Sequence, residues 1–161
     1  TARLYNCVFL RNHCADAVVA SPVSGLYASA SGIVANCTFL HNQCVGGTGT
    51  KYTVRGTLTM YNCLFWRNNG EGDGSTGTKA NNKLEADLAL ADFEDPLDWA
   101  TGLVPFPDEF DALVRTGIYR PSGLSVLLNA GDSSKNTTTT DILGLPRKVG
   151  DIDIGAFERQ Y

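Results

Sequence analysis

The sequence has few of the features that mark membrane-spanning, nucleic-acid-binding or metal-binding chains. No window approaches about 18 unbroken apolar residues, so we expect no membrane-spanning segment. The formal net charge is −4, whereas general nucleic-acid binders carry a basic surplus, so we expect no nucleic-acid partner. There is no C-x-x-C pair, and the only two histidines, His13 and His41, lack a converging partner. We therefore expect neither a metal site nor a cofactor.

The start of the chain also lacks a methionine and a charged-then-apolar signal segment. Because Thr1 is the first residue, we expect a processed or truncated product. The 161 residues are 43% apolar and 19% charged, an ordinary mix for one compact folded domain.

Charge is spread unevenly along the chain. Residues 1–84 hold seven Lys or Arg and three acids, whereas residues 85–111 hold nine acids and no Lys or Arg. Either the acidic stretch is a solvated loop, or it lies against the basic first half of the chain.

A repeat in the first half sets the expected fold. The pattern N-C-x-F-x-x-N occurs at residues 6–12, 36–42 and 62–68, at spacings of 30 and 26 residues. These spacings are too short for strand–helix–strand units, and no amphipathic helix lies between the copies. They suit one complete turn of a coiled parallel sheet, with three short strands and three bends. Adjacent coils would lie about 4.8 Å apart, which brings each residue over its equivalent in the next coil.

Residues at equivalent positions of successive coils would stack on one another, and this stacking gives the repeat two structural roles. Cysteine and phenylalanine two positions apart fit strand alternation, and they predict an inward-facing core stack together with Leu4, Val34 and Met60. Asparagine tolerates bend conformations, and stacked amides can pass hydrogen bonds from coil to coil. We expect these asparagines to be structural rather than substrate ligands. The predicted core stack is Cys7, Cys37, Cys63, Phe9, Phe39 and Phe65, and the predicted ladder is Asn6, Asn36, Asn62, Asn12, Asn42 and Asn68.

The chain has five cysteines, and this odd count leaves at least one thiol unpaired. Those of the repeat suit small buried hydrophobes, a setting that denies them a catalytic role. Cys14 and Cys44 would be neighbours in adjacent coils, at a Cα separation that a disulfide permits; a bridge and two free thiols both remain open.

The outward neighbours of the core stack are unexpectedly apolar. Because a solvent-facing strand alternates with polar residues, we expect segment 84–115, or otherwise a partner, to cover this face. Residues 79–91 could form a short helix or a continuing strand, residues 133–140 an exposed loop, and residues 151–158 a half-buried strand. The apolar outward residues are Val8, Leu10, Leu40, Leu64 and Trp66.

The N-C-x-F-x-x-N repeats resemble those of bacterial right-handed parallel β-helix proteins of the pectate-lyase-like superfold. Four pieces resemble the end of a β-helix family found in Bacteroidetes and labelled a choice-of-anchor domain. These are residues 92–96 (DFEDP), 129–131 (NAG), 141–147 (DILGLPR) and 153–158 (DIGAFE). The resemblance implies an all-β, right-handed parallel β-helix of about three coils over residues 1–78. An irregular capping region over residues 79–161 would pack on it to form a single unit. It also implies export to an extracellular, cell-surface or outer-membrane setting, and it fixes no single activity.

A catalytic constellation is missing from the repeat region. Its only acids are Asp16, Glu71 and Asp73, and none recurs at one repeat position, as paired carboxylates would require. The candidate carbohydrate contacts are a recurring tyrosine pair and a basic strip, although packing under a loop and a solvated basic edge are the simpler explanations for them. These candidates are Tyr5, Tyr61, Arg11, His41 and Arg67.

Three hypotheses follow from these observations. The first is a structural or carbohydrate-binding C-terminal β-helix module of a larger secreted or surface protein. The second is a portion of a polysaccharide lyase or glycosidase whose active site lies in coils absent here. The third is an accessory subunit of an outer-membrane complex. A three-coil solenoid exposes strand edges at an uncapped end, so we expect missing coils or a partner chain at the N-terminal open end.

Overall fold

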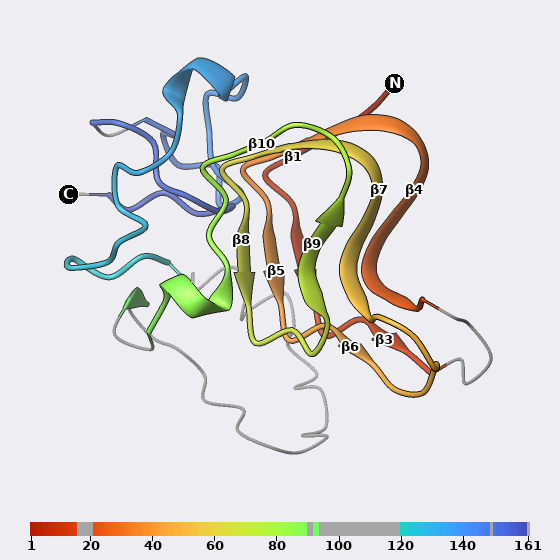
Figure 1. Cartoon of the computed structure of the whole chain (residues 1–161). Helices are drawn as coiled ribbons and strands as arrows, with labels where there is room; N and C mark the ends of the chain where they lie inside the picture. The colour runs from red at the N-terminus through yellow and green to blue at the C-terminus, as the bar shows by residue number, and fades with distance from the viewer. Residues whose placement is uncertain (16–20, 90–91, 94–119, 149, 161) are drawn as a thin grey trace.

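Three parallel sheets form the body of the molecule (Figure 1). The computed structural model describes residues 1–15, 21–89, 92–93, 120–148 and 150–160. The first sheet contains β1 (Ala2–Tyr5), β4 (Val23–Ala35) and β7 (Tyr52–Tyr61), with β9 (Glu71–Ser75) and β10 (Lys79–Ala80) both paired to β7. The second contains β2 (Val8–Leu10), β5 (Thr38–Leu40) and β8 (Leu64–Trp66). The third contains β3 (His13–Cys14) and β6 (Gln43–Cys44).

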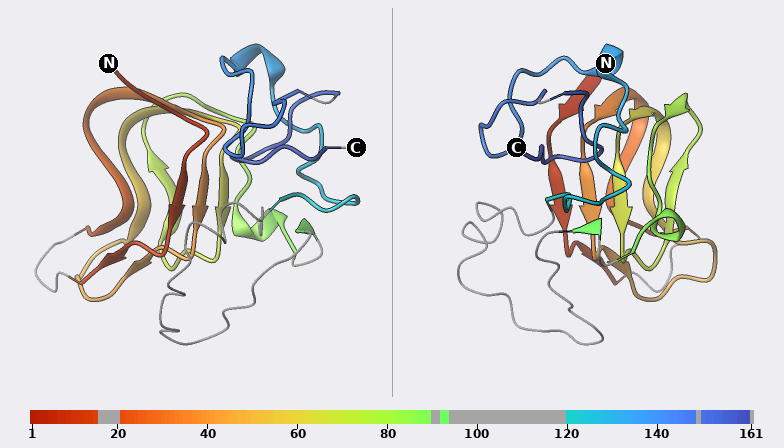
Figure 2. Two further views of the ribbon diagram at one scale, coloured as in Figure 1. Left: turned by 180° about the vertical axis from the view of Figure 1, so that it is seen from behind. Right: turned by 90° about the vertical axis from the view of Figure 1, so that its left-hand side faces the viewer.

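Each coil visits the sheets in the same order, so strands pair between coils rather than within them. The pairing is parallel in all three sheets, with Phe9, Phe39 and Phe65 in register across β2, β5 and β8. The predicted all-β fold, a parallel β-helix of about three coils, is confirmed. Its coils lie side by side in both views of Figure 2.

The core lies between the sheets and consists of like residues from successive coils. The ring centroids of Phe9 and Phe39 are 4.6 Å apart and those of Phe39 and Phe65 are 4.8 Å apart, with nearly parallel planes. Cys37 and Cys63 are fully buried beside these rings. The aromatic stack therefore repeats at the spacing of the strands themselves.

Two bends in each coil require the left-handed backbone region. At the first bend Asn6, Asn36 and Asn62 have φ between 51° and 53°, as expected for asparagine. At the second bend the left-handed residues are Arg11, His41 and Arg67, with φ between 50° and 52°, rather than the asparagines that follow them. The conformational reason given for both sets of asparagines therefore applies only to the first.

A partial fourth coil follows β8. Asn81 has φ 55°, like Asn62 one coil earlier, and Lys83 forms a parallel bridge with Leu64. The amide oxygen of Asn82 accepts a hydrogen bond from the backbone N–H of Cys63 at 2.9 Å. Of the two alternatives for residues 79–91, the described part contains the short strand β10 and a 3₁₀ turn, η1 (Glu85–Asp87).

This last coil ends the core with polar side chains. Asp73 is in register with the buried Val54, and its side chain is only 6% exposed. It lies 3.4 Å from Lys79 Nζ and accepts a 3.4 Å hydrogen bond from Asn82. Inward-facing charge at a sheet end opposes edge-to-edge association, so Asp73 disfavours the pairing of a further strand at this end.

The C-terminal region covers the outside of the β2–β5–β8 sheet (Figures 1 and 2). Leu40, Leu64 and Trp66 pack in one buried cluster with residues of the tail. Of the predicted covering segment 84–115, the described residues contribute Leu88 and Phe93, and residues 94–115 lie outside the described part. The other described residues of the cover come from further along the chain: Leu127, Ala130, Ile142, Leu143, Ile154, Ala156 and Phe157.

The strand predicted over residues 151–158 is wrong: this segment is irregular, although residues 152–158 are all buried. Gly155 has φ 106°, which interrupts an extended strand. Backbone groups of this segment form long-range hydrogen bonds. The N–H of Ile154 donates to the carbonyl of Leu127, and the N–H of Gly155 donates to the carbonyl of Asn62. In residues 151–158, acidic side chains that anchor the backbone alternate with buried apolar side chains. This alternation therefore does not mark a strand. Residues 133–140 contain a 3₁₀ turn, η3 (Ser133–Lys135), and irregular chain.

Candidate functional site

The asparagines of the second bend form a continuous hydrogen-bonded ladder. Asn12 donates from its backbone N and its Nδ2 to Oδ1 of Asn42, at 3.0 and 2.9 Å. Asn42 donates to Oδ1 of Asn68 in the same way, with both distances 2.9 Å. The spare amide hydrogens of Asn42 and Asn68 reach the carbonyls of Phe9 and Phe39. Since these side chains are committed to the backbone of neighbouring coils, the ladder serves the fold.

The asparagines of the first bend are tied to the tail instead. Asn62 donates to Asn36 at 3.0 Å, but Asn36 donates to Asn136 at 2.9 Å. Asn6 donates to the carbonyl of Thr140 at 2.6 Å. The backbone N–H of Asp132 completes the contact by donating to Asn62 at 2.7 Å. This bend therefore fastens the segment around η3 to the coils.

The two candidate tyrosines occupy one register position on the outside of the first sheet. Tyr5 pairs with Ala35 and Ala35 with Tyr61, so a small residue separates the two rings. Lys135 of η3 places its Nζ 5.5 Å from the centroid of the Tyr61 ring. Ala35 is 0% exposed, so the space between the rings is filled. The pair is partly covered and does not form an open aromatic platform.

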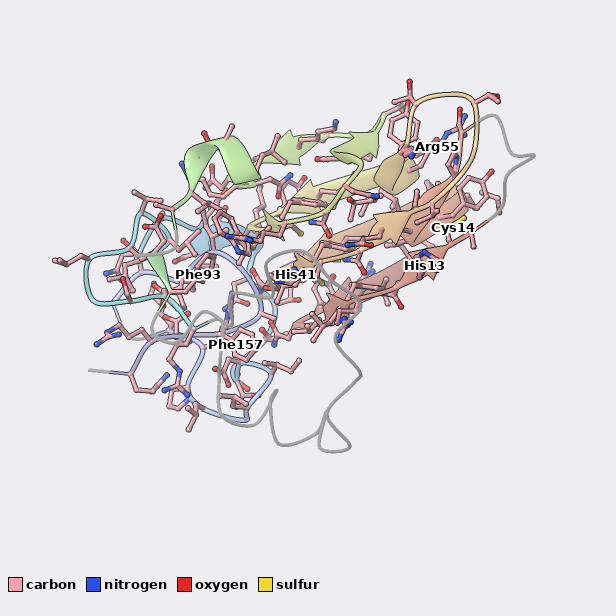
Figure 3. All side chains as sticks on the ribbon, turned by 90° about the horizontal axis from the view of Figure 1, so that it is seen from below. His13, Cys14, His41, Arg55, Phe93 and Phe157 are labelled. Carbon is pink, nitrogen blue, oxygen red and sulfur yellow. The ribbon has the colours of Figure 1, made fainter. Side chains whose placement is uncertain are left out.

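The candidate basic strip lies at the other end of the β2–β5–β8 sheet. Arg11, His41 and Arg67 follow these strands directly, and His41 is only 8% exposed. The Arg67 guanidinium lies 5.6 Å from the centroid of the Trp66 ring. Figure 3 shows His41 between the end of the coils that carries His13 and the side where Phe93 and Phe157 lie.

The tyrosines and the basic strip are not brought together. Arg11 follows Tyr5 by six positions, with the bend at Asn6 and the whole of β2 between them. The face between them is the apolar one that the tail covers. The five candidate residues therefore form two separate rows rather than one continuous groove.

The buried charges of the tail form a second polar cluster. Arg147 is fully buried, and its Nη2 donates to the carbonyls of Asp153 and Gly155 at 3.0 and 2.6 Å. Its Nε lies 3.8 Å from the carboxylate of Glu158, which is itself buried. Burial lowers the pKa of Arg147, an effect that the neighbouring carboxylates oppose.

The carboxylates of this cluster hold backbone N–H groups. Asp141 accepts from Leu143, Leu145 and Glu158. Asp153 accepts from Asn129 and Arg159, both at 2.8 Å, although burial raises its pKa. The residues that carry the family resemblance thus fix the irregular tail, because its described residues form isolated bridges but no strand ladder that would satisfy their backbone.

All five cysteines are free thiols. Cys14 and Cys44 lie opposite each other in the pairing of β3 with β6, and no disulfide joins them. The pKa of Cys7 is raised first by its contact with Cys37, and that of Cys37 by its contact with Cys63, with burial adding to both. Thiols that hold their protons this strongly are poor nucleophiles.

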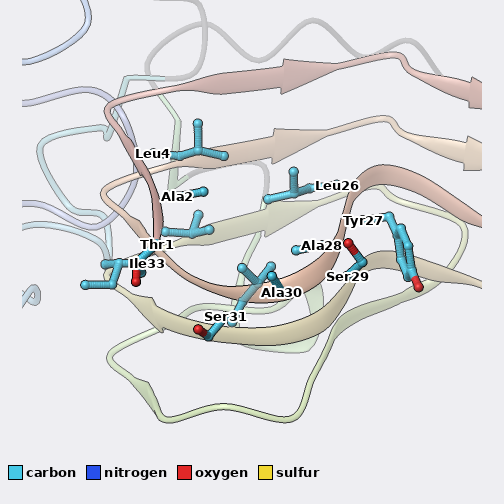
Figure 4. A pocket seen from close by; sticks show the side chains of 12 residues that line it. Thr1, Ala2, Leu4, Leu26, Tyr27, Ala28, Ser29, Ala30, Ser31 and Ile33 are labelled. Atoms are coloured by element: carbon cyan, nitrogen blue, oxygen red, sulfur yellow. The ribbon is translucent and has the colours of Figure 1, made fainter.

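An open hollow of about 380 Å³ lies beside the first coil (Figure 4). Leu4 and Leu26 line it from inside the coils, and Tyr27 stands at its rim. Residues 29–31 of β4 form its curved side. Here β4 has three residues between the paired positions 28 and 32, whereas β7 has only Thr57 between their partners Gly56 and Leu58. The lining residues are apolar or carry hydroxyl groups.

Sequence reasoning missed two sets of residues. The repeat continues at Asn81, Asn82 and Leu84, which occupy its asparagine, cysteine and phenylalanine positions in turn. The spacing of 19 residues from Asn62 to Asn81 could have revealed this further copy. Tyr27 and Arg55 are in register on β4 and β7. Their spacing of 28 matches neither repeat interval, because a bulge shifts the pairing on each side of them.

Among the described residues, no three or more His, Cys, Asp or Glu side chains gather in a way that could hold a metal ion. The described part also contains no helix with the length and apolarity needed to cross a membrane. Comparison with protein-family models, with curated proteins and with solved structures gives no significant match.

Proposed function

We propose that this chain is a non-catalytic β-helix module that binds carbohydrate on the outside of its coils. The observation that carries the proposal is that the buried carboxylates of the described residues are committed to the fold. Asp92, Asp141 and Asp153 accept backbone N–H groups, and Glu158 faces Arg147. Acid–base cleavage of a glycosidic bond needs carboxylates that are available to the substrate.

The outside of the solenoid supports the binding role. Parallel pairing holds side chains of successive coils in rows at the strand spacing, about 4.8 Å. Exposed aromatic and basic side chains at fixed register positions, such as Tyr27 and Arg55, suit a repeating ligand such as a polysaccharide, since aromatic faces pack on sugar rings and basic side chains bind their anionic groups. The rigid asparagine ladders keep these rows in place without a ligand.

The setting of the module is part of the same proposal. We place it in a larger secreted or cell-surface bacterial protein of the pectate-lyase-like β-helix kind, with the tail acting as its choice-of-anchor-type end. The resemblance of residues 141–147 and 153–158 supports this placement. Further coils of that protein, or a partner chain, would lie against the first coil. An intact mass of the source protein far above 17.2 kDa would support it.

A glycan panel with a turnover assay tests the proposal. The chain is incubated with neutral and uronate-containing polysaccharides, and binding and new unsaturated or reducing ends are measured in parallel. Binding without turnover is the expected result. Turnover would instead support the polysaccharide lyase or glycosidase hypothesis, and the absence of any binding would refute the carbohydrate role.

A further inference from the structure

An exposed aromatic and basic cluster lies on the first sheet, away from the candidate rows. Tyr27 on β4 is 64% exposed and is paired in register with Arg55 on β7, which is also exposed. Arg55 is in turn paired with Gly74 on β9. Figure 3 shows Arg55 at the opposite end of the coils from Phe93 and Phe157, away from these described residues of the tail.

A second aromatic ring completes the row. The ring of Tyr52 lies beside Gly74, where a Cβ atom would overlap it, so the absence of a side chain at position 74 makes room for the ring. The Arg55 guanidinium lies 5.4 Å from the centroid of the same ring, a cation–π contact. The row therefore contains a tyrosine of β4, a guanidinium of β7 and a second tyrosine of β7, whose ring lies beside Gly74 of β9.

The guanidinium is held in position but keeps most of its donors. Arg55 Nη1 donates to the carbonyl of Ser21 at 3.3 Å, and no carboxylate of the described residues pairs with it. Asp73, next to Gly74 in sequence, is in register with the buried Val54 and pairs with Lys79. Lys51, next to Tyr52 in sequence, adds a second cation to this end of the sheet.

We infer that Tyr27, Tyr52 and Arg55 form a binding site for a carboxylate-bearing sugar within a glycan chain. The planar fork of Arg55 matches a carboxylate, to which it can donate two parallel hydrogen bonds. The tyrosine faces on either side match the C–H faces of pyranose rings. A neutral sugar would leave the guanidinium unused, and a simple inorganic anion would leave both rings unused.

This inference rests on the proposed carbohydrate-binding function and adds to it a site and a ligand class. The test titrates the full chain with trisaccharides of galacturonate and of glucuronate, with their methyl esters as neutral counterparts, and with inorganic phosphate. Calorimetry gives the affinity, and NMR spectra report which amides shift. We expect at least one of the acidic trisaccharides to bind more tightly than its ester and than phosphate, and to shift residues of β4 and β7.

Variants then locate the site. R55A is expected to weaken binding by about tenfold or more, the loss typical of one charged hydrogen bond, and Y27A by a smaller factor. K148A removes an exposed cation that pairs with Asp151 on the tail, and should leave affinity unchanged. Because Tyr27 and Arg55 are exposed, urea unfolding of these variants should match that of the unmodified chain, which separates lost binding from lost folding.

The outcomes distinguish the two proposals. Binding of an acidic trisaccharide that survives both R55A and Y27A would overturn this site while the carbohydrate role stands. Equal affinity for acid and ester, or for phosphate alone, would overturn the carboxylate-sugar assignment. Failure of every sugar in this series and in the wider glycan panel would refute the proposed function itself.

Discussion

Replacement of Asn42 by alanine gives the sharpest test of the asparagine ladder. The side chain of Asn42 takes part in four hydrogen bonds: two from Asn12, one to Asn68 and one to the carbonyl of Phe9. Alanine at position 42 removes all four and leaves their partners without this amide. At a net contribution of about 1 kcal/mol each, N42A should lower the free energy of unfolding by about 3–4 kcal/mol.

Asn12 supplies a matched control in the same row. It is exposed, and its own side chain donates only one ladder bond, since the other bond from this residue comes from its backbone N. N12A should therefore cost about 1 kcal/mol or less. With a urea m-value of about 2 kcal/mol/M, the midpoint should fall by about 1.5–2 M for N42A and by at most about 0.5 M for N12A.

The assay is equilibrium urea unfolding followed by circular dichroism, with both variants compared with the unmodified chain. A native spectrum in water shows that each variant still folds. If the two variants lose the same stability within about 0.5 kcal/mol, the amide ladder does not stabilise the coils as the hydrogen bonds indicate.

Three further perturbations test the core, the tail and the thiols. F39A removes the middle ring of the stack and should cost about 3–5 kcal/mol in urea unfolding, more than F9A at its half-buried end; equal losses would contradict the stack. R147M leaves Glu158 buried without its cation and should cost about 3–5 kcal/mol, part of which the double variant R147M/E158L restores; strictly additive losses would show that the pair is not coupled. Because the pKa of Cys37 is raised above its ordinary value of 9.0, the folded state keeps a proton that the unfolded state loses, so stability is full below pH 9 and declines above it. C37A should reduce that alkaline decline by up to about 1.4 kcal/mol per pH unit, measured by urea unfolding between pH 8 and 10, and an unchanged decline would exclude this thiol as its cause.

The repeat region could be predicted from sequence because its contacts join equivalent positions. Once residues 6–12, 36–42 and 62–68 are aligned, Phe39 must lie between Phe9 and Phe65 in any coiled parallel sheet. One repeated pattern therefore determines strand order, register and core together. The shorter fourth coil was missed because only Asn81 keeps the expected residue type, while Asn82 replaces cysteine to end the core.

The tail could not be predicted in the same way. Its structure depends on single long-range contacts, such as Gly155 to the carbonyl of Asn62 and Ala156 to the hydroxyl of Thr38. No periodicity reports such contacts, and the alternation of residues 151–158 suggested a strand although Gly155 adopts a positive φ. The apolar outward residues did reveal that a cover exists, but they carried no information on which segment supplies it.

In the candidate site too, contacts that follow the repeat could be predicted and the other contacts could not. The repeat correctly placed Tyr5 with Tyr61 and Arg11 with Arg67 in rows, because these positions follow the coil interval. It gave no sign that Lys135 of the tail lies over one tyrosine. Tyr27 and Arg55 come together only through bulges in β4, which no spacing in the sequence encodes.

Contacts between phenylalanine rings test the stacked coils most directly. In a sample with isotope labels only at phenylalanine, the ring of Phe39 should show nuclear Overhauser effects to the rings of both Phe9 and Phe65, and none should join Phe9 to Phe65. A direct Phe9–Phe65 effect, or no effect from Phe39 to either ring, would contradict the parallel β-helix and every inference drawn from its rows.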